Sequence, residues 1–264
     1  MQADTVGCMA TRAERSTSFG MVAVDYDRLR PPPAGEAVDW LIPARRGTLV
    51  DVGAGTGLLT RALASRAAHV IAVEPDERMR AVLQSRSPGV AVTEGTGEAI
   101  PLPDASADGV FASSAWHWMD PARAVPEIAR VLRDGGRFGL IWTGRERDIP
   151  WLRAGEWFGE APVDARDRTP RGPDGRRLVQ LPDGSPFVNI ETATFRYTRP
   201  MAPADIVEML TTYSAVITAD PQAVERGRGR AAAALAAQFP GATMIDVPMR
   251  SHCWRADRIA RAAD

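Results

Sequence analysis

Residues 49–60 read Leu49-Val50-Asp51-Val52-Gly53-Ala54-Gly55-Thr56-Gly57-Leu58-Leu59-Thr60. An apolar run that leads into small residues and then into a helical pattern predicts a buried strand, a tight turn and the start of a helix. Because glycine has no Cβ, the three glycines permit a sharp turn and let the backbone approach a ligand within van der Waals distance. The stretch therefore predicts a ligand-binding loop whose backbone N–H groups face the ligand.

The spacing of the glycines narrows the choice of ligand. A dinucleotide-binding loop has the pattern G-x-G-x-x-G, but here the third glycine comes one residue early and Leu58 occupies the later position. This spacing counts against NAD. Glu74 closes the next predicted strand, at about the distance from the loop that mononucleotide-binding folds show. Asp51, the G-x-G-x-G loop and Glu74 together resemble the class I S-adenosylmethionine-dependent methyltransferases.

This resemblance implies a set of cofactor contacts. The glycine loop would pack under the methionine part of S-adenosylmethionine, and Glu74 would hold the ribose hydroxyls, since a carboxylate can accept two charge-assisted hydrogen bonds from a diol. Glu74 could instead be a helix-start acid beside Asp76. The implied contacts are Asp51, Gly53, Ala54, Gly55, Thr56, Gly57, Glu74, Pro75, Met79, Thr96, Gly97, Glu98, Ser113 and Ser114.

Residues 94–104, which read EGTGEAIPLPD, extend the resemblance. In methyltransferases related to the ubiquinone and menaquinone C-methylases, also called the type 11 family, a similar segment borders the adenine. Gly97 stands where that segment usually has Ala, and Thr96 where Asp is commoner, so a Thr hydroxyl or a backbone carbonyl would have to contact the adenine. With Gly135-Gly136 before the fifth strand, the resemblance covers residues 47 to 142.

The expected fold is α/β, a Rossmann-like methyltransferase fold with a seven-stranded, mostly parallel sheet and helices on both faces. Apolar runs and alternation place strands near 49–52, 69–73, 90–92, 108–112, 137–142, 190–198 and 246–255. The resemblance implies that the last two form an antiparallel pair. Helical spacing places helices at 36–44, 76–86, 203–219 and 221–238, and after Gly57 and Asp120.

The chain is long enough to bury one core in a single domain. Residues 1–18 are polar and aperiodic and predict a flexible tail before a domain at 19–264. Residues 19–33 predict a lid segment over the cofactor, with Tyr26 and Arg30 as contacts, although Tyr26 could pack on the domain edge and Arg30 could be solvated. Residues 143–187, rich in Arg, Asp, Gly and Pro, predict an insertion or cap.

Composition excludes several kinds of chemistry. The formal net charge is -1 and the pI is near 6.3, which gives no overall attraction for nucleic acid or an anionic membrane. All 32 basic residues are arginine, so Schiff-base, pyridoxal phosphate and P-loop chemistry lack their amine. Cys8 and Cys253 have no zinc-site spacing, and no metal is expected. With neither a signal peptide nor an apolar run of membrane-spanning length, we expect a cytoplasmic protein whose oligomeric state is open.

The candidate catalytic group is His117. Methyl transfer needs the acceptor atom held in line behind the methyl group at about 3 Å, and a hydroxyl or carbon acceptor must also lose a proton, for which an imidazole is suited. His69 starts a strand on the face away from the ligand and His252 lies late in the last strand. This leaves His117 as a base or hydrogen-bond partner, unless it only packs between its tryptophan neighbours.

A small-molecule acceptor is favoured by what the sequence lacks. Amino-directed DNA or protein methylases resemble one another in an (Asp/Asn/Ser)-Pro-Pro-Tyr motif where this chain has Ser-Ser-Ala-Trp, and neither cysteine follows a proline as in cytosine C5 methylases. Aromatic residues could line an apolar acceptor pocket or simply belong to the core: Trp116, Trp118, Trp142 and Tyr213. Two alternatives stay open, a protein that binds S-adenosylmethionine or S-adenosylhomocysteine without transferring methyl, and an NAD-dependent oxidoreductase.

Overall fold

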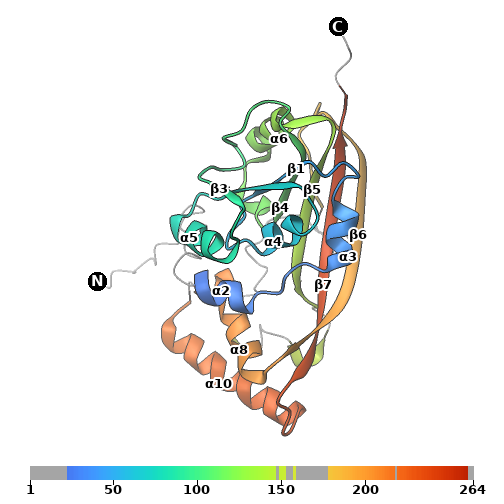
Figure 1. Cartoon of the computed structure of the whole chain (residues 1–264). Helices are drawn as coiled ribbons and strands as arrows, with labels where there is room; N and C mark the ends of the chain where they lie inside the picture. The colour runs from blue at the N-terminus through green and yellow to red at the C-terminus, as the bar shows by residue number, and fades with distance from the viewer. Residues whose placement is uncertain (1–22, 147–148, 153–156, 159–177, 218, 261–264) are drawn as a thin grey trace, which may run out of the picture.

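The first predicted strand, β1 (Thr48–Val52), lies at the centre of a seven-stranded sheet of order β3-β2-β1-β4-β5-β7-β6 (Figure 1). The computed structural model describes residues 23–146, 149–152, 157–158, 178–217 and 219–260. Six strands are parallel, and β7 runs antiparallel to both of its neighbours, which confirms the expected Rossmann-like fold. The other strands are β2 (His69–Val73), β3 (Ala91–Thr93), β4 (Ala107–Ser113), β5 (Leu132–Arg145), β6 (Phe187–Met201) and β7 (Ile245–Arg258).

Helices cover both faces of the sheet, because successive side chains of a strand point to opposite faces. Leu49 packs in a cluster with α3 (Gly35–Leu41) and α4 (Leu58–Ala64). Val50 belongs to a second cluster that includes the buried side of α6 (Pro121–Val131). α5 (Glu77–Arg86) contributes Leu83 to a third, smaller cluster. Burial on both faces explains why the central strands are continuous apolar runs.

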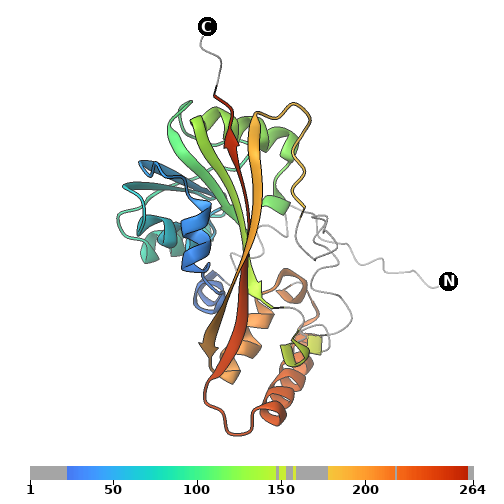
Figure 2. The same ribbon diagram turned by 90° about the vertical axis from the view of Figure 1, so that its right-hand side faces the viewer.

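A separate helical cap lies beyond the carboxyl ends of the parallel strands (Figures 1 and 2). It contains α2 (Ala23–Leu29), the short 3-10 helix η3 (Pro150–Leu152), α8 (Pro203–Thr211), α9 (Ser214–Ile217) and α10 (Pro221–Gln238). Its buried core includes Leu29, Leu152, Leu210 and Leu235, together with Met249 from β7. The long strands β5, β6 and β7 run down from the sheet into this cap (Figure 2), so the antiparallel strands connect the two parts.

Several element limits differ from those predicted. β5 extends beyond residues 137–142 at both ends, because its pairing with β7 continues as far as Arg145. The single helix predicted at 203–219 is two helices, since α8 ends where the buried Thr212 hydroxyl donates to the Met209 carbonyl oxygen at 2.6 Å. The predicted tail, the start of the lid segment and residues 159–177 of the predicted insertion lie outside the described residues. Within the described ranges, every helix is too short or too polar to cross a bilayer.

Candidate functional site

The loops that carry the predicted site residues meet at one edge of the sheet. β1 and β4 are neighbours, but the chain continues from β1 to β2 on one side and returns to β4 on the other. In open α/β sheets ligands bind at such a switch point, outside the carboxyl ends of the strands. The loops that follow β1, β2 and β4 are therefore brought together there, as the sequence predicts.

The glycine loop after β1 has three residues in the left-handed region, Gly53, Gly55 and Gly57, with φ of 64°, 57° and 89°. A Cβ at Gly53 would lie 2.7 Å from the Cβ of Ala115, and one at Gly57 would lie 2.9 Å from Cγ of Leu83, so both positions are closed by packing. A Cβ at Gly55 would meet no atom of the described residues within 4 Å. Gly55 therefore faces open space, as a loop that cradles a ligand requires.

Glu74 is fixed against this loop by two backbone donors. Its carboxylate accepts from Gly55 N at 2.7 Å and from Asp76 N at 2.9 Å, and Arg80 donates to the carbonyl oxygens of Glu74 and Pro75. Burial raises the pKa of Glu74. The cap of α5 is Asp76, which accepts from the N–H groups of Arg78 and the buried Met79. The helix-start role thus belongs to Asp76, and the Glu74 carboxylate stays beside the glycine loop.

Asp51 and Thr56 carry buried polar atoms without a protein partner. Asp51 is fully buried; its Oδ2 accepts from the Thr60 hydroxyl at 2.6 Å, and its Oδ1 has no hydrogen-bond partner among the described residues. The Thr56 hydroxyl, also buried, has none either. Burial is the largest of the effects that raise the pKa of Asp51 to about 7. The hydrogen bond from Thr60 lowers this pKa, and the negative charge of Glu74 raises it further. Ala54 completes the loop, its carbonyl accepting from Gly57 N at 3.0 Å.

The predicted adenine-bordering segment is held against the loop after β4. Thr96 and Ala99 form an isolated bridge, and Glu98 accepts from Asp120 N at 2.7 Å. A Cβ at Gly97 would lie 2.5 Å from Sδ of Met119. The close approach of Met119 explains why glycine occupies this position instead of alanine.

The loop after β4 carries two of the aromatic candidates, Trp116 and Trp118, which differ in burial. Ser113 ends β4, and Ser114 has a left-handed φ of 53° while donating to the Ile141 carbonyl at 2.8 Å. Trp116 is only 5% exposed and packs edge-on against Phe138 in the core, with ring centroids 5.5 Å apart. Its place is that of a core residue. His117 and Trp118 are half-buried with ring centroids 4.7 Å apart, so they remain the candidates for contact with a substrate.

Of the predicted lid residues, Tyr26 lies in α2 and Arg30 directly follows it, and α2 is tied to the glycine loop through Asp27. Asp27 of α2 pairs with Nη2 of Arg61 at 2.6 Å, and Nη1 of Arg61 donates to the Thr56 carbonyl at 2.8 Å. At the end of α2, the Arg30 guanidinium lies 5.0 Å from the ring centroid of Tyr26 and 3.9 Å from that of Tyr213. Arg30, which the sequence predicts as a cofactor contact, is thus in direct contact with Tyr213, a candidate for contact with the acceptor.

Two residues that sequence reasoning set aside or overlooked lie beside these candidates. His252 of β7 is paired in register with Trp142 of β5, and the rings stack at 6.1 Å with an interplanar angle of 22°. Its Nδ1 is 3.1 Å from the Thr194 hydroxyl. The position of His252 late in the last strand suggested a remote residue, but an antiparallel strand brings it back to the carboxyl half of β5. The second is Arg145, whose guanidinium lies 5.5 Å from the Tyr213 ring centroid.

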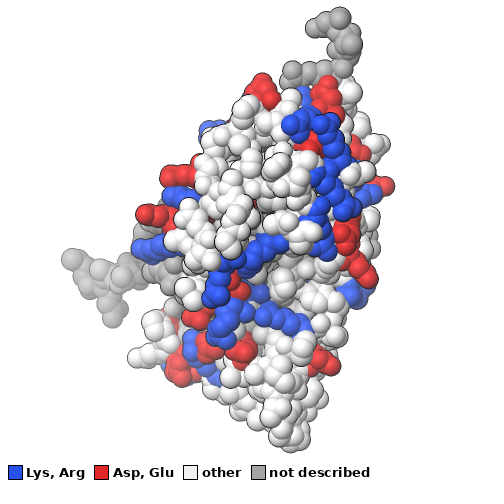
Figure 3. Space-filling view, in the orientation of Figure 1, with Lys and Arg blue, Asp and Glu red and all other residues white. Residues whose placement is uncertain are grey.

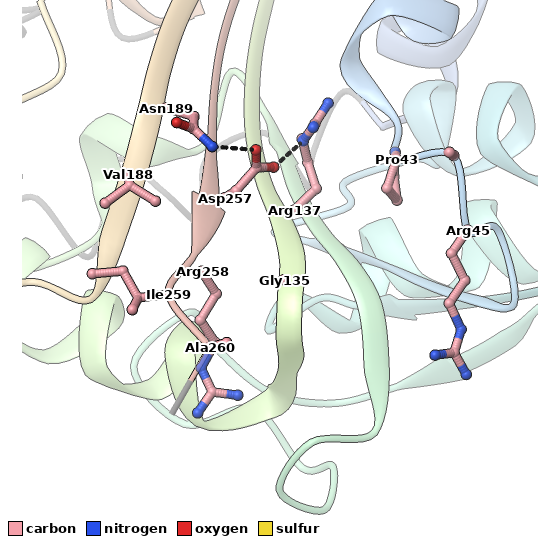
Figure 4. A pocket seen from close by; sticks show the side chains of 11 residues that line it. Pro43, Arg45, Gly135, Arg137, Val188, Asn189, Asp257, Arg258, Ile259 and Ala260 are labelled. Atoms are coloured by element: carbon pink, nitrogen blue, oxygen red, sulfur yellow. Dashed lines mark hydrogen bonds and ion pairs between the residues drawn. The ribbon is translucent and has the colours of Figure 1, made fainter. Parts of the chain in front are cut away.

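A surface depression of about 650 Å³ lies at the opposite, amino end of the parallel strands. Figure 4 shows Arg137 and Asn189 both reaching the carboxylate of Asp257, at 2.7 and 3.3 Å. Because ligands in this type of sheet bind at the carboxyl ends, this depression is distinct from the candidate site. Among the residues that the structure describes, no group of three or more His, Cys, Asp or Glu side chains could hold a metal ion.

Comparison with known proteins points to one family. The methyltransferase domain family matches residues 50–140. An uncharacterized methyltransferase of Mycobacterium tuberculosis is 40% identical over 213 residues, which cover 80% of this chain and 83% of the relative. One of Schizosaccharomyces pombe is 29% identical over 206 residues, covering 75% of this chain and 79% of the relative. The solved structure of a proposed type II methyltransferase from Anaeromyxobacter dehalogenans has a TM-score of 0.64 and 27% identity, covering 88% of this chain and 99% of that one.

Proposed function

The chain belongs to the methyltransferase family, and we propose that it transfers a methyl group from S-adenosylmethionine to a small-molecule acceptor. The observation that carries this proposal is the contact of the Glu74 carboxylate with Gly55 N, next to a loop face that is open at Gly55. A diol-binding carboxylate beside an open glycine turn is what a nucleoside ligand requires.

The residues present fit S-adenosylmethionine. The glycine loop would hold the methionyl part, Glu74 the ribose, and the segment of Thr96, Gly97 and Glu98 the adenine. The buried Asp51 Oδ1 and Thr56 hydroxyl, which have no protein hydrogen bond in the described part of the chain, support a polar ligand at this loop. When bound, S-adenosylmethionine supplies a methyl group that its sulfonium has already activated.

The protein's share of the chemistry is positioning, exclusion of water and removal of a proton. The cap helices cover the carboxyl ends of the strands, where they can exclude water and hold an acceptor in line. His117 and His252 are the histidines on this side, and an imidazole is a suitable base for taking a proton from a hydroxyl or carbon acceptor. Trp118, Trp142 and Tyr213 offer an aromatic surface for the acceptor. Whether O, N or C is methylated depends on that acceptor.

Calorimetry with purified protein tests the cofactor assignment. We expect binding of S-adenosylmethionine and S-adenosylhomocysteine and none of NADH. Glu74→Gln should weaken binding about tenfold, because a neutral amide loses the charge-assisted hydrogen bonds to the ribose. Absence of binding by folded wild-type protein would refute the proposal.

A second measurement separates transfer from binding alone. Mass spectrometry of reactions with candidate acceptors should detect products one methyl group heavier, together with S-adenosylhomocysteine. Binding of S-adenosylmethionine without methyl transfer to any of a broad set of small molecules would favour a regulator or a non-methylating catalyst.

The pH dependence of the methylation rate identifies the base. A base that becomes protonated at low pH makes the rate fall there, so this fall should disappear in His117→Gln or in His252→Gln, whichever residue is the base.

A further inference from the structure

Two arginines from distant parts of the chain converge on one tyrosine ring. The guanidinium carbon of Arg30, at the end of α2, lies 3.9 Å from the ring centroid of Tyr213, and that of Arg145, at the end of β5, lies 5.5 Å from it. Both distances lie within the range of cation–π contacts. Each arginine also donates to a carbonyl oxygen at 3.0 Å, Arg30 to Thr212 and Arg145 to Leu152. These contacts fix the positions of the two cations but leave their charges uncompensated.

Neither cation has a carboxylate partner within the described ranges, although carboxylates lie close by in sequence. Asp27, three residues before Arg30, pairs with Arg61 and Arg86. Glu146, next to Arg145, pairs with Arg196 and Arg250. On the face shown in Figure 3 the basic side chains form a diagonal band, and acidic side chains lie along its edges. The pair of cations on Tyr213 therefore differs from the paired charges near it. Among the residues that the structure describes, the buried Nε of Arg30 also has no hydrogen-bond acceptor.

The location of this pair is on the acceptor side of the site. Arg145 is the last residue of β5, beyond the carboxyl ends of the central strands, and Tyr213 follows α8 in the cap. A guanidinium binds carboxylate and phosphate oxygens through paired N–H donors. We propose that Arg30 and Arg145 on Tyr213 form an oxyanion site that selects an acceptor carrying a carboxylate or phosphate group. This inference rests on the proposed methyl transfer and names the class of its substrate.

Ring-matched probes test the site in the full chain. Benzoate, phenyl phosphate and benzamide share a phenyl ring and differ in charge, and their binding is followed by NMR titration with saturating S-adenosylhomocysteine. We expect the wild type to prefer benzoate or phenyl phosphate to benzamide by about fivefold or more. Tighter binding of benzoate than of phenyl phosphate would show that the site selects a carboxylate, and the reverse order would show that it selects a phosphate. Arg145→Gln should abolish the preference and leave the S-adenosylhomocysteine affinity within about twofold.

Two further variants control this comparison. Arg228→Gln removes a cap arginine that is paired with Glu208 at 2.7 Å, and it should keep the preference for the anion. Arg145→Lys keeps the charge without the paired donors and should retain part of the preference. Thermal unfolding establishes that each variant is folded. If Arg145→Gln does not fold, Arg145→Met, which also removes the charge but keeps an unbranched side chain, takes its place and should likewise abolish the preference.

The outcomes distinguish this inference from the proposed function. Equal affinity of the wild type for the three probes, or a preference that survives Arg145→Gln, overturns the inference alone. A large loss of S-adenosylhomocysteine affinity in Arg145→Gln with an intact preference means that the arginines hold the carboxylate of the cofactor, which also overturns it. Failure of the wild type to bind S-adenosylhomocysteine refutes the proposed function and this inference with it.

Discussion

Gly55 and Gly135 have similar backbone conformations and open surroundings among the described residues, but Gly55 lies in the glycine loop after β1 and Gly135 in β5. Both lie in the left-handed region, with φ of 57° and 70°, and an added Cβ meets nothing within 4 Å at either position. We expect Gly55→Ala and Gly135→Ala each to lower the free energy of unfolding by about 1 kcal/mol, because alanine is strained at positive φ. Only Gly55→Ala should weaken binding of S-adenosylhomocysteine, measured by calorimetry, since its methyl group enters the space before the loop. Equal affinities in the two variants would contradict the assigned cradle.

The buried carboxyl of Asp51 makes stability depend on pH. Its pKa is raised from 3.8 to about 7 in the folded protein, by burial first of all. Between about pH 4 and 7 the unfolded chain therefore releases this proton before the folded protein does, so the free energy of unfolding falls as pH rises and levels off above 7. The loss is on the order of 4 kcal/mol for a shift of this size.

Asp51→Asn tests this pH dependence, because an amide cannot ionise and still accepts from Thr60. Urea denaturation at several pH values should give a flatter profile for Asp51→Asn than for the wild type. Asp39→Asn removes an exposed carboxyl paired with Arg66, and it should leave the downward slope from pH 5 to 7 in place. Parallel profiles for the wild type and Asp51→Asn would mean that Asp51 titrates normally.

At the scale of elements, α2 depends on its contacts for stability. It has seven residues, too few for a stable isolated helix, and the Asp27–Arg61–Thr56 connection holds it to the glycine loop. We expect Asp27→Asn to weaken S-adenosylhomocysteine binding severalfold and to increase proteolysis near α2. The matched control is again Asp39→Asn, which breaks the pair between Asp39 of α3 and Arg66, just after α4. The connection has no role in the lid if both variants bind like the wild type.

Two glycines of α10 differ only in what lies beside them. A Cβ at the buried Gly227 would lie 2.3 Å from Cδ1 of Phe158, whereas one at the exposed Gly229 meets nothing within 4 Å. We expect Gly229→Ala to raise the free energy of unfolding by about 1 kcal/mol through helix propensity. Gly227→Ala gains the same propensity but must displace Phe158, so it should be less stable than Gly229→Ala by about 1–3 kcal/mol. Thermal and urea unfolding measure both, and equal stability would show that Phe158 moves away at no cost.

Among the described residues, the hydrophobic clusters of the sheet and that of the cap are built differently. The sheet clusters are covered by helices on both faces, whereas the cap forms a separate cluster at the ends of β5, β6 and β7. We expect native-state hydrogen exchange in low denaturant to open α8 and α10 at a lower free energy than β1 and β4. Exchange of all four elements at one common free energy would mean that the cap and the sheet unfold as a single unit.

The sequence by itself determined the family, the parallel part of the sheet and the position of the glycine loop after β1. These follow from local patterns: the apolar run into Gly53-Ala54-Gly55, Glu74 at the end of the next strand, and Asp76 and Asp120 at helix starts. Each pattern acts within about one turn or one strand, so it can be read without knowledge of distant contacts. The individual site residues remain predictions until a ligand is bound.

Only the tertiary structure decided which distant residues share the acceptor side. The direction and register of β7 place His252 beside Trp142, and the packing of the cap places Arg30 against Thr212, 182 positions away in the sequence. Packing against Phe138 of β5 places Trp116 in the sheet core, whereas Trp118 stays half-buried. Antiparallel register and helix docking depend on burial summed over many contacts, which no single motif encodes.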